Sequence, residues 1–313
     1  MKQKILFHVG LHKTGTTSLQ QNFFVAKNKF LQHPKGRRIW LPIFVNKFST
    51  EQLGKLDRRI IQNFSNFSKS LNLTPVISNE RLSGYPISGG YDRLSIYTRI
   101  SSLDLDVKIL FIIREQKEWL YSAWRQMITD GGSISLKEFL QQKPLVHNVR
   151  RPGARFEYLN YYMELRKLNE LFGSENVLVY PMELIFSDFD NFKRRISMLL
   201  EDDFTKIDKK NLPRLNERKT LSEFYAQWFL NNYVLSSPAS PGGLISDQTK
   251  IGARIRFFSK KLFCFLPEIP FSKKIIETHK AIIAREVGDY YVGSNKLASQ
   301  ALGINLAEIG YDA

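Results

Sequence analysis

The sequence predicts an α/β protein in which helices cover both faces of a parallel sheet, giving three layers. Val107–Ile113 (VKILFII) is a nearly continuous run of β-branched and apolar residues, which is typical of a central parallel strand that is buried on both faces. Strand-like runs alternate with helical segments along the first two thirds of the chain, as in other parallel sheets. A glycine-rich turn follows the first strand.

The elements follow from the spacing of apolar residues. Ile5–Val9 is the first strand, and the next segment has helical spacing at Leu19, Phe23 and Phe30. The further expected helices are Thr50–Leu71, Tyr91–Leu103, Gln116–Thr129 and Phe156–Phe172, and the further strands are Pro75–Ser78, Val107–Ile113 and Asn176–Tyr180.

The strand signals stop after about residue 210. Ser236–Gly243 (SSPASPGG) has the composition of a loop and lies between two helical stretches, Ser222–Tyr233 and Asp247–Leu266. We expect one domain over residues 1–313, in which a mostly helical part (about 211–313) caps an α/β body (about 1–210).

The chain is strongly basic, with a formal net charge of +16. This excess favours an anionic partner: nucleic acid, an acidic glycan, an anionic membrane or a polyphosphorylated cofactor. The alternative is a solvated basic surface, because the basic residues form small scattered clusters such as Lys35–Arg38, Arg150–Arg151 and Lys193–Arg195. Charge alone does not choose among these partners.

The composition also indicates where in the cell the protein is located. An apolar content of 43% provides for a substantial core, and no run of about eighteen uncharged apolar residues indicates a membrane-spanning helix. The first strand leads directly into the glycine loop, so a cleaved leader would remove the loop. We therefore expect a cytoplasmic protein, which the lone Cys264 fits.

The loop after the first strand has the pattern of an anion site. A glycine turn between a buried strand and a helix presents backbone N–H groups and the positive end of the helix dipole. The expected ligands are Gly10, Lys13, Thr14, Gly15, Thr16, Thr17 and Ser18. Nucleoside triphosphatases place a lysine directly after the second glycine, whereas Thr16 stands there in this chain and the lysine is Lys13. A chance glycine turn is the alternative interpretation.

Two segments resemble the sulfotransferases that use 3′-phosphoadenosine 5′-phosphosulfate (PAPS). GLHKTGTTSLQ (Gly10–Gln20) is similar to their 5′-phosphosulfate loop, and FIIREQKEWLYSAW has their strand-end arginine, Arg114, with Ser122 eight residues later. Phe156–Glu183 is similar to the scaffold around a later strand of the family. The resemblance covers roughly residues 4–200, and the wording of the loop is closer to the carbohydrate-directed and bacterial branch.

The resemblance implies a P-loop-like nucleotide-binding fold, PAPS as the donor, adenosine 3′,5′-bisphosphate as the product, and no metal. Lys13 would stabilise the charge on the transferred sulfuryl group, and Arg114 and Ser122 would bind the 3′-phosphate. Arg218 and Lys219, in a segment that loosely resembles a nucleotide-closing loop, would contact the same phosphate. The alternatives are an ion pair of Arg114 with Glu115 or Glu118, a solvated Ser122, and an ordinary helix start at Leu212–Ser222.

Two residues are candidates for the general base. Glu80 follows the strand PVIS at its carboxyl end, beside the expected cleft, and His12 is adjacent to Lys13 on the loop. The family uses either a glutamate or a histidine on a strand-end loop, which favours Glu80. The alternative for Glu80 is a salt bridge with Arg81, and His8 is expected to be a packed core residue.

The leading hypothesis is thus transfer of a sulfuryl group to a hydroxyl or amine, with a carbohydrate or glycolipid as the favoured acceptor. A P-loop kinase of a nucleoside or sugar is the second hypothesis, and the missing post-glycine lysine is the feature against it. A non-enzymatic protein that binds anionic surfaces is the third. We expect no nucleic-acid partner.

The segment Arg254–Lys274 contains six basic residues, one acidic residue and several phenylalanines. On a helix this pattern is typical of a segment that lies on a membrane surface. Such a helix would hold the protein against the inner face of an anionic membrane. The alternative is that the aromatic residues pack against the α/β body, as in most amphipathic helices. Pro267 and Pro270 would interrupt the helix.

Overall fold

The computed structural model describes residues 2–32, 43, 55–86, 89–142, 153–208, 220–237, 240 and 242–313. The chain divides into two compact units. Unit 1 comprises Met1–Glu115, Glu157–Leu215 and Asp289–Ala313, and unit 2 comprises Gln116–Phe156 and Asn216–Gly288. Each unit is therefore built from segments that are far apart in the sequence. That the chain acts as a single domain remains a prediction.

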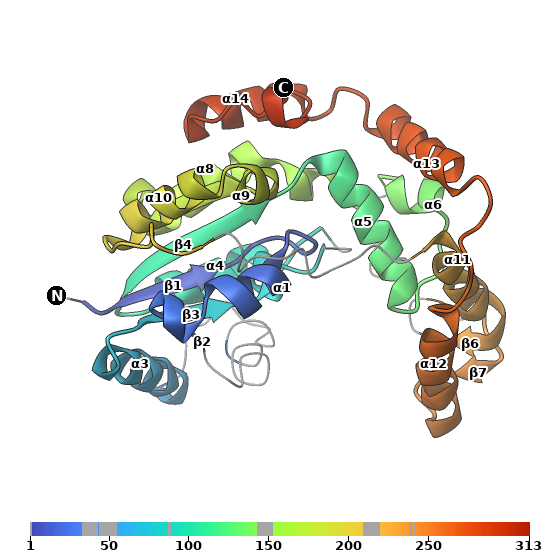
Figure 1. Ribbon diagram of the computed structural model, residues 1–313, viewed down its shortest axis with the longest axis horizontal. Helices are drawn as coiled ribbons and strands as arrows, with labels where there is room; N and C mark the ends of the chain where they lie inside the picture. Colours follow the sequence, from blue (N-terminus) through green and yellow to red (C-terminus); the bar gives the residue numbers. More distant parts are fainter. Residues whose placement is uncertain are drawn as a thin grey trace. The chain divides into compact units, whose positions relative to one another are not determined.

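Unit 1 contains a five-stranded parallel sheet, which confirms the expected fold class. The strands are β1 (Lys4–His8), β2 (Phe30–Gln32), β3 (Thr74–Ser78), β4 (Asp106–Ile113) and β5 (Val177–Pro181). Their order across the sheet is β2-β3-β1-β4-β5. Figure 1 shows the long strand β4 beside β1. The parallel register places His8 opposite Ser78 on one side and opposite Leu110 on the other.

Helices cover both faces of this sheet, because successive side chains of a strand point to opposite faces. Leu6, Val76 and Leu110 belong to one buried cluster with residues of the segments after β1 and β5. Phe7 and Ile109, which alternate with these residues, are also fully buried. On their face, α3 contacts β3, and α8 contacts β4 and β5. The alternation along each strand thus produces the expected three layers.

The helical segments of unit 1 are short in several places. They are α1 (Thr16–Ser18), η1 (Leu19–Phe23), η2 (Ala26–Asn28), α3 (Lys55–Ser70), η4 (Glu80–Ser83), α4 (Arg93–Ser101), α8 (Tyr161–Phe172), η7 (Ser174–Asn176), α9 (Met182–Ser187), α10 (Phe189–Leu200), α14 (Val292–Leu302) and η10 (Ala307–Ile309); η6 (Phe156–Leu159) begins in unit 2 and ends in unit 1.

The helix expected after the glycine loop is shorter than the apolar spacing indicated. The α-helical turn Thr16–Ser18 continues as one π-helical turn and ends at Phe23. Phe30 was counted as part of this helix, but it begins the edge strand β2 and is fully buried. Its ring stacks on Phe204 with centroids 4.6 Å apart. The sheet thus gains a strand because Phe30 packs better as a strand residue than as the end of a helix.

Unit 2 is mostly helical. Its elements are α5 (Gln116–Thr129), α6 (Leu136–Leu140), α11 (Leu221–Phe229), η9 (Leu230–Val234), β6 (Leu235–Ser236), β7 (Ile245–Ser246), α12 (Lys250–Phe263) and α13 (Ser272–Val287). The expectation that strands end near residue 210 was wrong in one detail, since β6 and β7 pair in parallel. They are two residues long, too short for any pattern of alternation.

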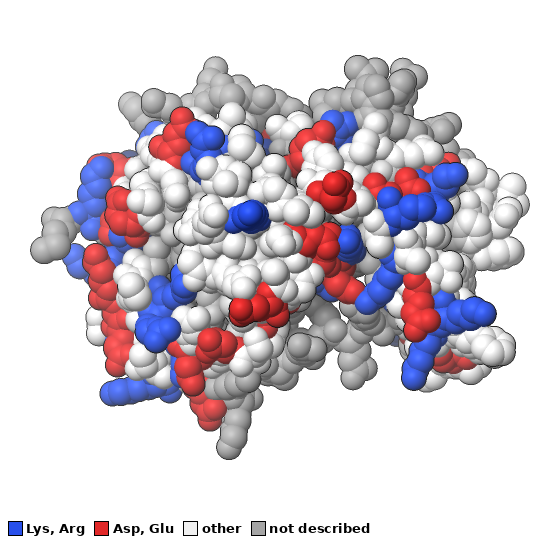
Figure 2. All heavy atoms as spheres, turned by 90° about the horizontal axis from the view of Figure 1, so that it is seen from above, with Lys and Arg blue, Asp and Glu red and all other residues white. Residues whose placement is uncertain are grey.

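Acidic and basic side chains are interspersed on the face of the molecule that Figure 2 presents. The structure also contains surface ion pairs, such as Lys2 with Asp104 and Lys29 with Asp202. On this face the basic excess therefore forms no continuous field. None of the described helices combines the length and the apolar character that crossing a bilayer requires.

Candidate active site

The glycine loop leaves the sheet at its carboxyl edge. Beyond the end of β1, the N–H of Val9 donates to Leu110 O (2.9 Å) and the N–H of Leu11 donates to Ile112 O (3.2 Å). The chain thus follows β4 for three more residues before it turns into α1. Ligands of open α/β sheets bind outside this edge. The loop therefore lies where an anionic ligand is expected.

The two glycines of the loop are needed for different reasons. Gly15 has a φ of 75°, in the left-handed region, at the start of α1. Gly10 does not have a positive φ, but a Cβ atom there would lie 2.9 Å from His8 Nε2 and 3.3 Å from Ile112 Cβ. Gly15 thus satisfies a backbone requirement, and Gly10 leaves space for the core beneath the loop.

Lys13 also has a left-handed backbone, with a φ of 65°. For a residue with a Cβ this conformation costs roughly 1–2 kcal/mol. Residues that keep such a conformation cluster at ligand sites, where the surrounding structure holds them in place. The Lys13 side chain is half-buried, three residues before the helix that begins at Thr16. The backbone therefore fixes where this lysine leaves the loop.

The hydroxyl residues of the loop differ in their partners. Thr14 is fully buried, and its Oγ1 donates to Leu11 O across the turn. Thr16 is 5% exposed, and its Oγ1 is buried with no hydrogen-bond partner among the described residues. Thr17 is half-buried and Ser18 is buried. An unsatisfied buried hydroxyl is costly, so Thr16 Oγ1 indicates a ligand atom at the start of α1.

Arg114 lies against the same loop. It follows the last residue of β4, and its Nη1 donates to Lys13 O at 3.0 Å. This contact brings Arg114 and Lys13 together within unit 1, at the carboxyl edge of the sheet. Whether Arg114 binds the 3′-phosphate remains a prediction.

Three side chains that sequence reasoning missed fix the backbone at Arg114. The Tyr161 hydroxyl donates to Arg114 O at 2.5 Å, and the next N–H, that of Glu115, donates to Glu183 Oε1 at 3.0 Å. The Tyr311 hydroxyl donates to the other oxygen of Glu183, at 3.0 Å. Burial raises the pKa of both tyrosines well above the usual value, so both hydroxyls keep their protons. No local sequence signal marks these contacts, because their partners are separated by up to 128 positions.

The remaining donor-binding candidates fall outside this group. Ser122 belongs to unit 2, where it is a half-buried residue of α5. Arg218 and Lys219 lie outside the described residues. Their roles at the 3′-phosphate remain predictions.

Both candidate bases lie at the carboxyl edge of the sheet. Glu80 begins the short helix η4 directly after β3, and the N–H of Asn79 donates to His8 O at 3.2 Å. His12 is half-buried on the loop. Arg81, the suggested partner of Glu80, pairs with Asp92, at 2.5 Å. The choice between Glu80 and His12 stays open.

A buried polar chain supports the loop from below. His8 is fully buried, as expected, and its Nδ1 lies 2.7 Å from Ser78 Oγ. Gln20 Nε2 donates to Ser78 O at 2.9 Å and to Ser78 Oγ at 3.1 Å. Burial lowers the pKa of His8 to about 3, so the ring is neutral. This chain joins the ends of β1 and β3 to the helical turn after the loop.

The described residues contain no group of three or more His, Cys, Asp or Glu side chains that could hold a metal ion. A cavity of about 500 Å³ lies at the opposite, amino-terminal edge of the sheet, where Lys4, Asp106 and Asn176 line it. It lies at the wrong end of the strands for ligands of the loop. The carboxyl edge is therefore the candidate active site.

No protein-family model matches the sequence, and no curated protein matches it. Several solved structures are similar to the chain, two of them as follows. One, the crystal structure of a sulfotransferase from Alicyclobacillus acidocaldarius, is 17% identical, covers 74% of this chain and 94% of that chain, and has a TM-score of 0.45. The other, the sulfotransferase domain from the Curacin biosynthetic pathway, is 9% identical, covers 91% and 97%, and has a TM-score of 0.38. At these values neither structure decides the role of any residue.

Proposed function

We propose that the protein is a sulfotransferase that moves a sulfuryl group from PAPS to an acceptor hydroxyl or amine. The observation that carries the proposal is the loop at the carboxyl end of β1, in which Lys13, held in a left-handed conformation, stands two residues before Gly15, the N-cap of α1. This loop combines a cation, hydroxyl groups and the N–H groups at the start of a helix within a few residues. Such a set of donors fits the diphosphate-like end of a phosphosulfate.

The chain's own residues would act mainly by position and charge, as in phosphoryl transfer. The Lys13 ammonium would stabilise the negative charge that grows on the bridging oxygen as the S–O bond to the phosphate breaks. The backbone N–H groups at the start of α1 and the Thr16 hydroxyl would bind the phosphate. A base, Glu80 or His12, would take the proton of the acceptor as the new S–O or S–N bond forms. The products are the sulfated acceptor and adenosine 3′,5′-bisphosphate.

A thermal-shift titration tests the donor class. We expect adenosine 3′,5′-bisphosphate to stabilise the protein without magnesium, by an amount that grows with ligand concentration. Stabilisation by ATP only, and only with magnesium, would support a kinase instead. A response to neither nucleotide would contradict both enzymes and leave a protein that binds anionic surfaces.

The favoured acceptor class is a carbohydrate or a glycolipid, on the basis of the loop sequence Gly10–Gln20 alone. We would test it by measuring release of adenosine 3′,5′-bisphosphate from PAPS with panels of oligosaccharides, glycolipids, phenols and amines. Turnover with the sugar-containing panels would support the assignment. Turnover confined to phenols or amines would overturn the acceptor class and leave the sulfotransferase proposal in place.

A further inference from the structure

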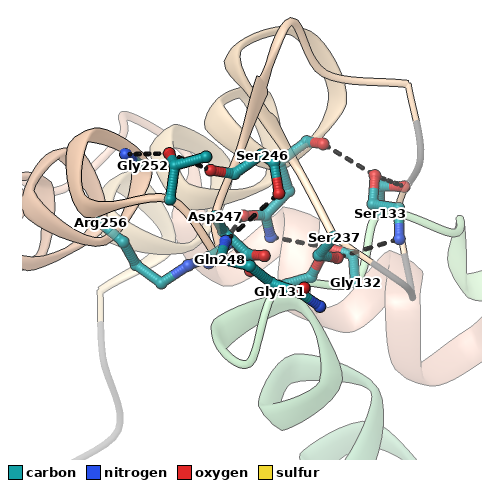
Figure 3. A network of polar contacts seen from close by, with 12 residues as sticks. Gly131, Gly132, Ser133, Ser237, Ser246, Asp247, Gln248, Gly252 and Arg256 are labelled. Carbon is teal, nitrogen blue, oxygen red and sulfur yellow. Dashed lines mark hydrogen bonds and ion pairs between the residues drawn. The ribbon is translucent and has the colours of Figure 1, made fainter.

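The helix α12 is held to unit 2 along one side. Arg256 Nη2 pairs with Asp247 at 2.9 Å, and its Nη1 donates to Asn231 Oδ1 at 3.3 Å. Figure 3 shows Arg256 pointing from the helix toward Asp247 and the Gly131–Gly132 turn. On the same side, a Cβ atom on Gly252 would come within 2.1 Å of Ser246 O. This side of α12 is therefore packed, and Arg256, a basic residue of the segment, is engaged within the unit.

Another side of α12 carries large apolar residues that are exposed. Ile251, Phe258 and Leu262 are spaced by seven and four residues, so they form one stripe along the helix, and they are 64%, 64% and 65% exposed. Phe257 beside this stripe is 56% exposed, and beyond the helix Phe265 and Phe271 are each 82% exposed. The alternative in which these aromatic residues pack against the body is wrong for these positions. Single exposed apolar residues are ordinary, whereas a cluster of this size marks an interaction surface.

Basic residues border the apolar stripe. Lys250, Arg254 and Lys261 repeat at four and seven positions, so they form a neighbouring row, and all three are exposed. Lys273 and Lys274 at the start of α13 are exposed as well. Glu268 is the one acidic residue between Lys250 and Lys274, and its Oε1 accepts hydrogen bonds from the N–H groups of Leu221 and Ile269. The exposed side of α12 thus carries an apolar stripe with a basic row beside it.

Phe271 adds an independent observation. Its φ is 63°, a left-handed conformation that is rare for a bulky residue, and its side chain is 82% exposed. Two features of Phe271 are unfavourable in the isolated chain: the strain of its backbone and the exposure of its ring to water. Outliers of this kind occur where a contact with a ligand compensates for them.

We propose that this surface, the α12 patch, binds the interface of an anionic lipid bilayer. The patch comprises Ile251, Phe257, Phe258 and Leu262 of α12 and Phe265 just beyond it, with the basic border Lys250, Arg254 and Lys261. Helices that lie in a bilayer interface combine an apolar face of Phe and Leu residues with basic residues at its edge. The basic residues attract the headgroups, and the apolar side chains enter the acyl boundary.

The chemistry of the patch favours a bilayer over other partners. A polyanion such as a nucleic acid would match the basic border but would leave five exposed aromatic and aliphatic side chains of α12 and its extension in water. A second copy of the chain, related by a twofold axis, would place two rows of lysine and arginine against each other, and like charges in contact destabilise a complex. A bilayer satisfies both the apolar stripe and the basic row beside it.

Flotation of the full-length protein with lipid vesicles tests the proposal. One vesicle preparation contains phosphatidylcholine alone, and the other also contains about one third phosphatidylglycerol. We expect the protein to float with the anionic vesicles at about 0.05 M salt and to lose most of this binding at about 0.5 M salt, because the Debye length shortens. Phosphatidylcholine alone should bind it weakly at both salt concentrations.

Two pairs of substitutions separate the apolar and the charged contributions. Phe258→Ser with Leu262→Ser should abolish flotation, and Arg254→Gln with Lys261→Gln should weaken it about thirtyfold, or about fivefold per charge. The matched controls are Phe67→Ser with Met198→Ser and Lys69→Gln with Arg166→Gln, which change residues that are equally exposed in unit 1. The controls should bind vesicles like the wild type.

Each outcome decides the proposal. Salt-dependent flotation that only the α12 variants lose, with unchanged melting temperatures, supports it. Absence of flotation at low salt, or equal loss in the controls, overturns it. A wild-type dimer that the Phe258→Ser with Leu262→Ser variant converts to a monomer, measured by light scattering, also overturns it and makes the patch an interface between copies. A Phe258→Trp variant gives a second readout, since its fluorescence should shift to the blue with anionic vesicles and remain unshifted if the patch stays in water.

Discussion

Lys13 has both a strained backbone conformation and a positively charged side chain. Its φ of 65° lies where glycine or asparagine is the ordinary choice, yet the chain places a lysine there and a glycine two positions later. A substitution by glycine removes the side chain and the strain together, whereas a substitution by alanine removes the side chain alone. The two changes therefore separate catalysis from stability.

We predict that Lys13→Gly and Lys13→Ala both lower kcat about 10²–10³-fold, because each removes the same stabilisation of the transition state. Lys13→Gly should nevertheless be more stable than Lys13→Ala by about 1 kcal/mol, since glycine adopts the left-handed conformation freely. Sulfuryl transfer and urea unfolding measure the two effects. Lys13→Arg, which keeps the charge, serves as the comparison, and near-normal kcat in the glycine variant would contradict the assigned role.

Tyr161 tests whether the backbone at Arg114 is positioned for donor binding. Tyr161→Phe removes the hydroxyl that donates to Arg114 O, and a lost hydrogen bond of this kind is worth about 1 kcal/mol. We expect the Kd of adenosine 3′,5′-bisphosphate to rise about three- to tenfold, with kcat at saturating donor close to that of the wild type.

Tyr180→Phe is the matched control for Tyr161→Phe. Tyr180 is fully buried in β5, and its hydroxyl has no hydrogen-bond partner among the described residues. This variant should bind the nucleotide like the wild type, as titration calorimetry would show. Equal losses in both variants would assign Tyr161 a purely structural role.

At the scale of elements, the sequence predicted the strand β4 of unit 1 and the helix α5 of unit 2 well, because both have long and regular apolar patterns. Val107–Ile113 and Gln116–Thr129 were placed within one residue of β4 and α5. The loop residues Gly10–Ser18 were predicted as a group because they are contiguous, and the structure places them at the carboxyl edge together with Arg114. The edge strand β2 was missed, because three residues carry too little periodicity to outweigh helical spacing.

Sequence reasoning could not find contacts that depend on tertiary packing. Tyr161, Glu183 and Tyr311 meet Arg114–Glu115 from three distant segments. Gly10 was identified as a turn residue, but a glycine is needed there because His8 and Ile112 leave no space for a Cβ atom. Requirements of this kind can be recognised only from the three-dimensional positions of the neighbouring side chains.

The two glycines of the loop should respond differently to an added methyl group. Gly15→Ala meets nothing closer than 3.7 Å, so its cost is the left-handed backbone, about 1 kcal/mol. Gly10→Ala brings a Cβ atom to 2.9 Å from His8 Nε2, and overpacking of this kind costs about 1–3 kcal/mol. Urea unfolding measures both, with Gly293→Ala as the control, which meets nothing within 4 Å in α14 and should not destabilise the protein, since alanine favours a helix over glycine.

A double substitution distinguishes these two causes. His8→Asn shortens the side chain that the new Cβ atom would meet, so Gly10→Ala should cost less in the His8→Asn background than in the wild type. Gly15→Ala should cost the same in both backgrounds, because its strain lies in its own backbone. Additive losses for Gly10 and His8 would contradict the steric explanation.

At the scale of the whole molecule, stability depends on pH through His8. Burial lowers the pKa of His8 to about 3 in the folded protein, whereas the unfolded chain has a pKa of about 6.5. Between these values the unfolded state binds more protons, so the free energy of unfolding falls as the pH is lowered below 6.5. The contribution of His8 is complete at neutral pH and is lost progressively down to about pH 3.

We predict that this residue accounts for about 2 kcal/mol of the stability lost between pH 7 and pH 5. His8→Asn, which retains a polar group near Ser78, should show a correspondingly smaller loss over this interval, even if it is less stable at pH 7. Urea unfolding at the two pH values measures the difference. An identical loss in the variant and the wild type would show that His8 does not titrate in this way.

The segments of the two units alternate along the chain, and the last segment of unit 1 is Asp289–Ala313. This segment supplies Tyr311, whose hydroxyl holds Glu183, which in turn accepts the N–H of Glu115 at the end of β4. During synthesis, the ribosome releases the glycine loop early and Tyr311 almost three hundred residues later. A nascent chain can form β1 and β4 long before it can complete the surroundings of Arg114. We therefore expect the proposed nucleotide site to be completed only after translation has passed Tyr311, so that ribosome-bound intermediates bind the donor more weakly than the released chain.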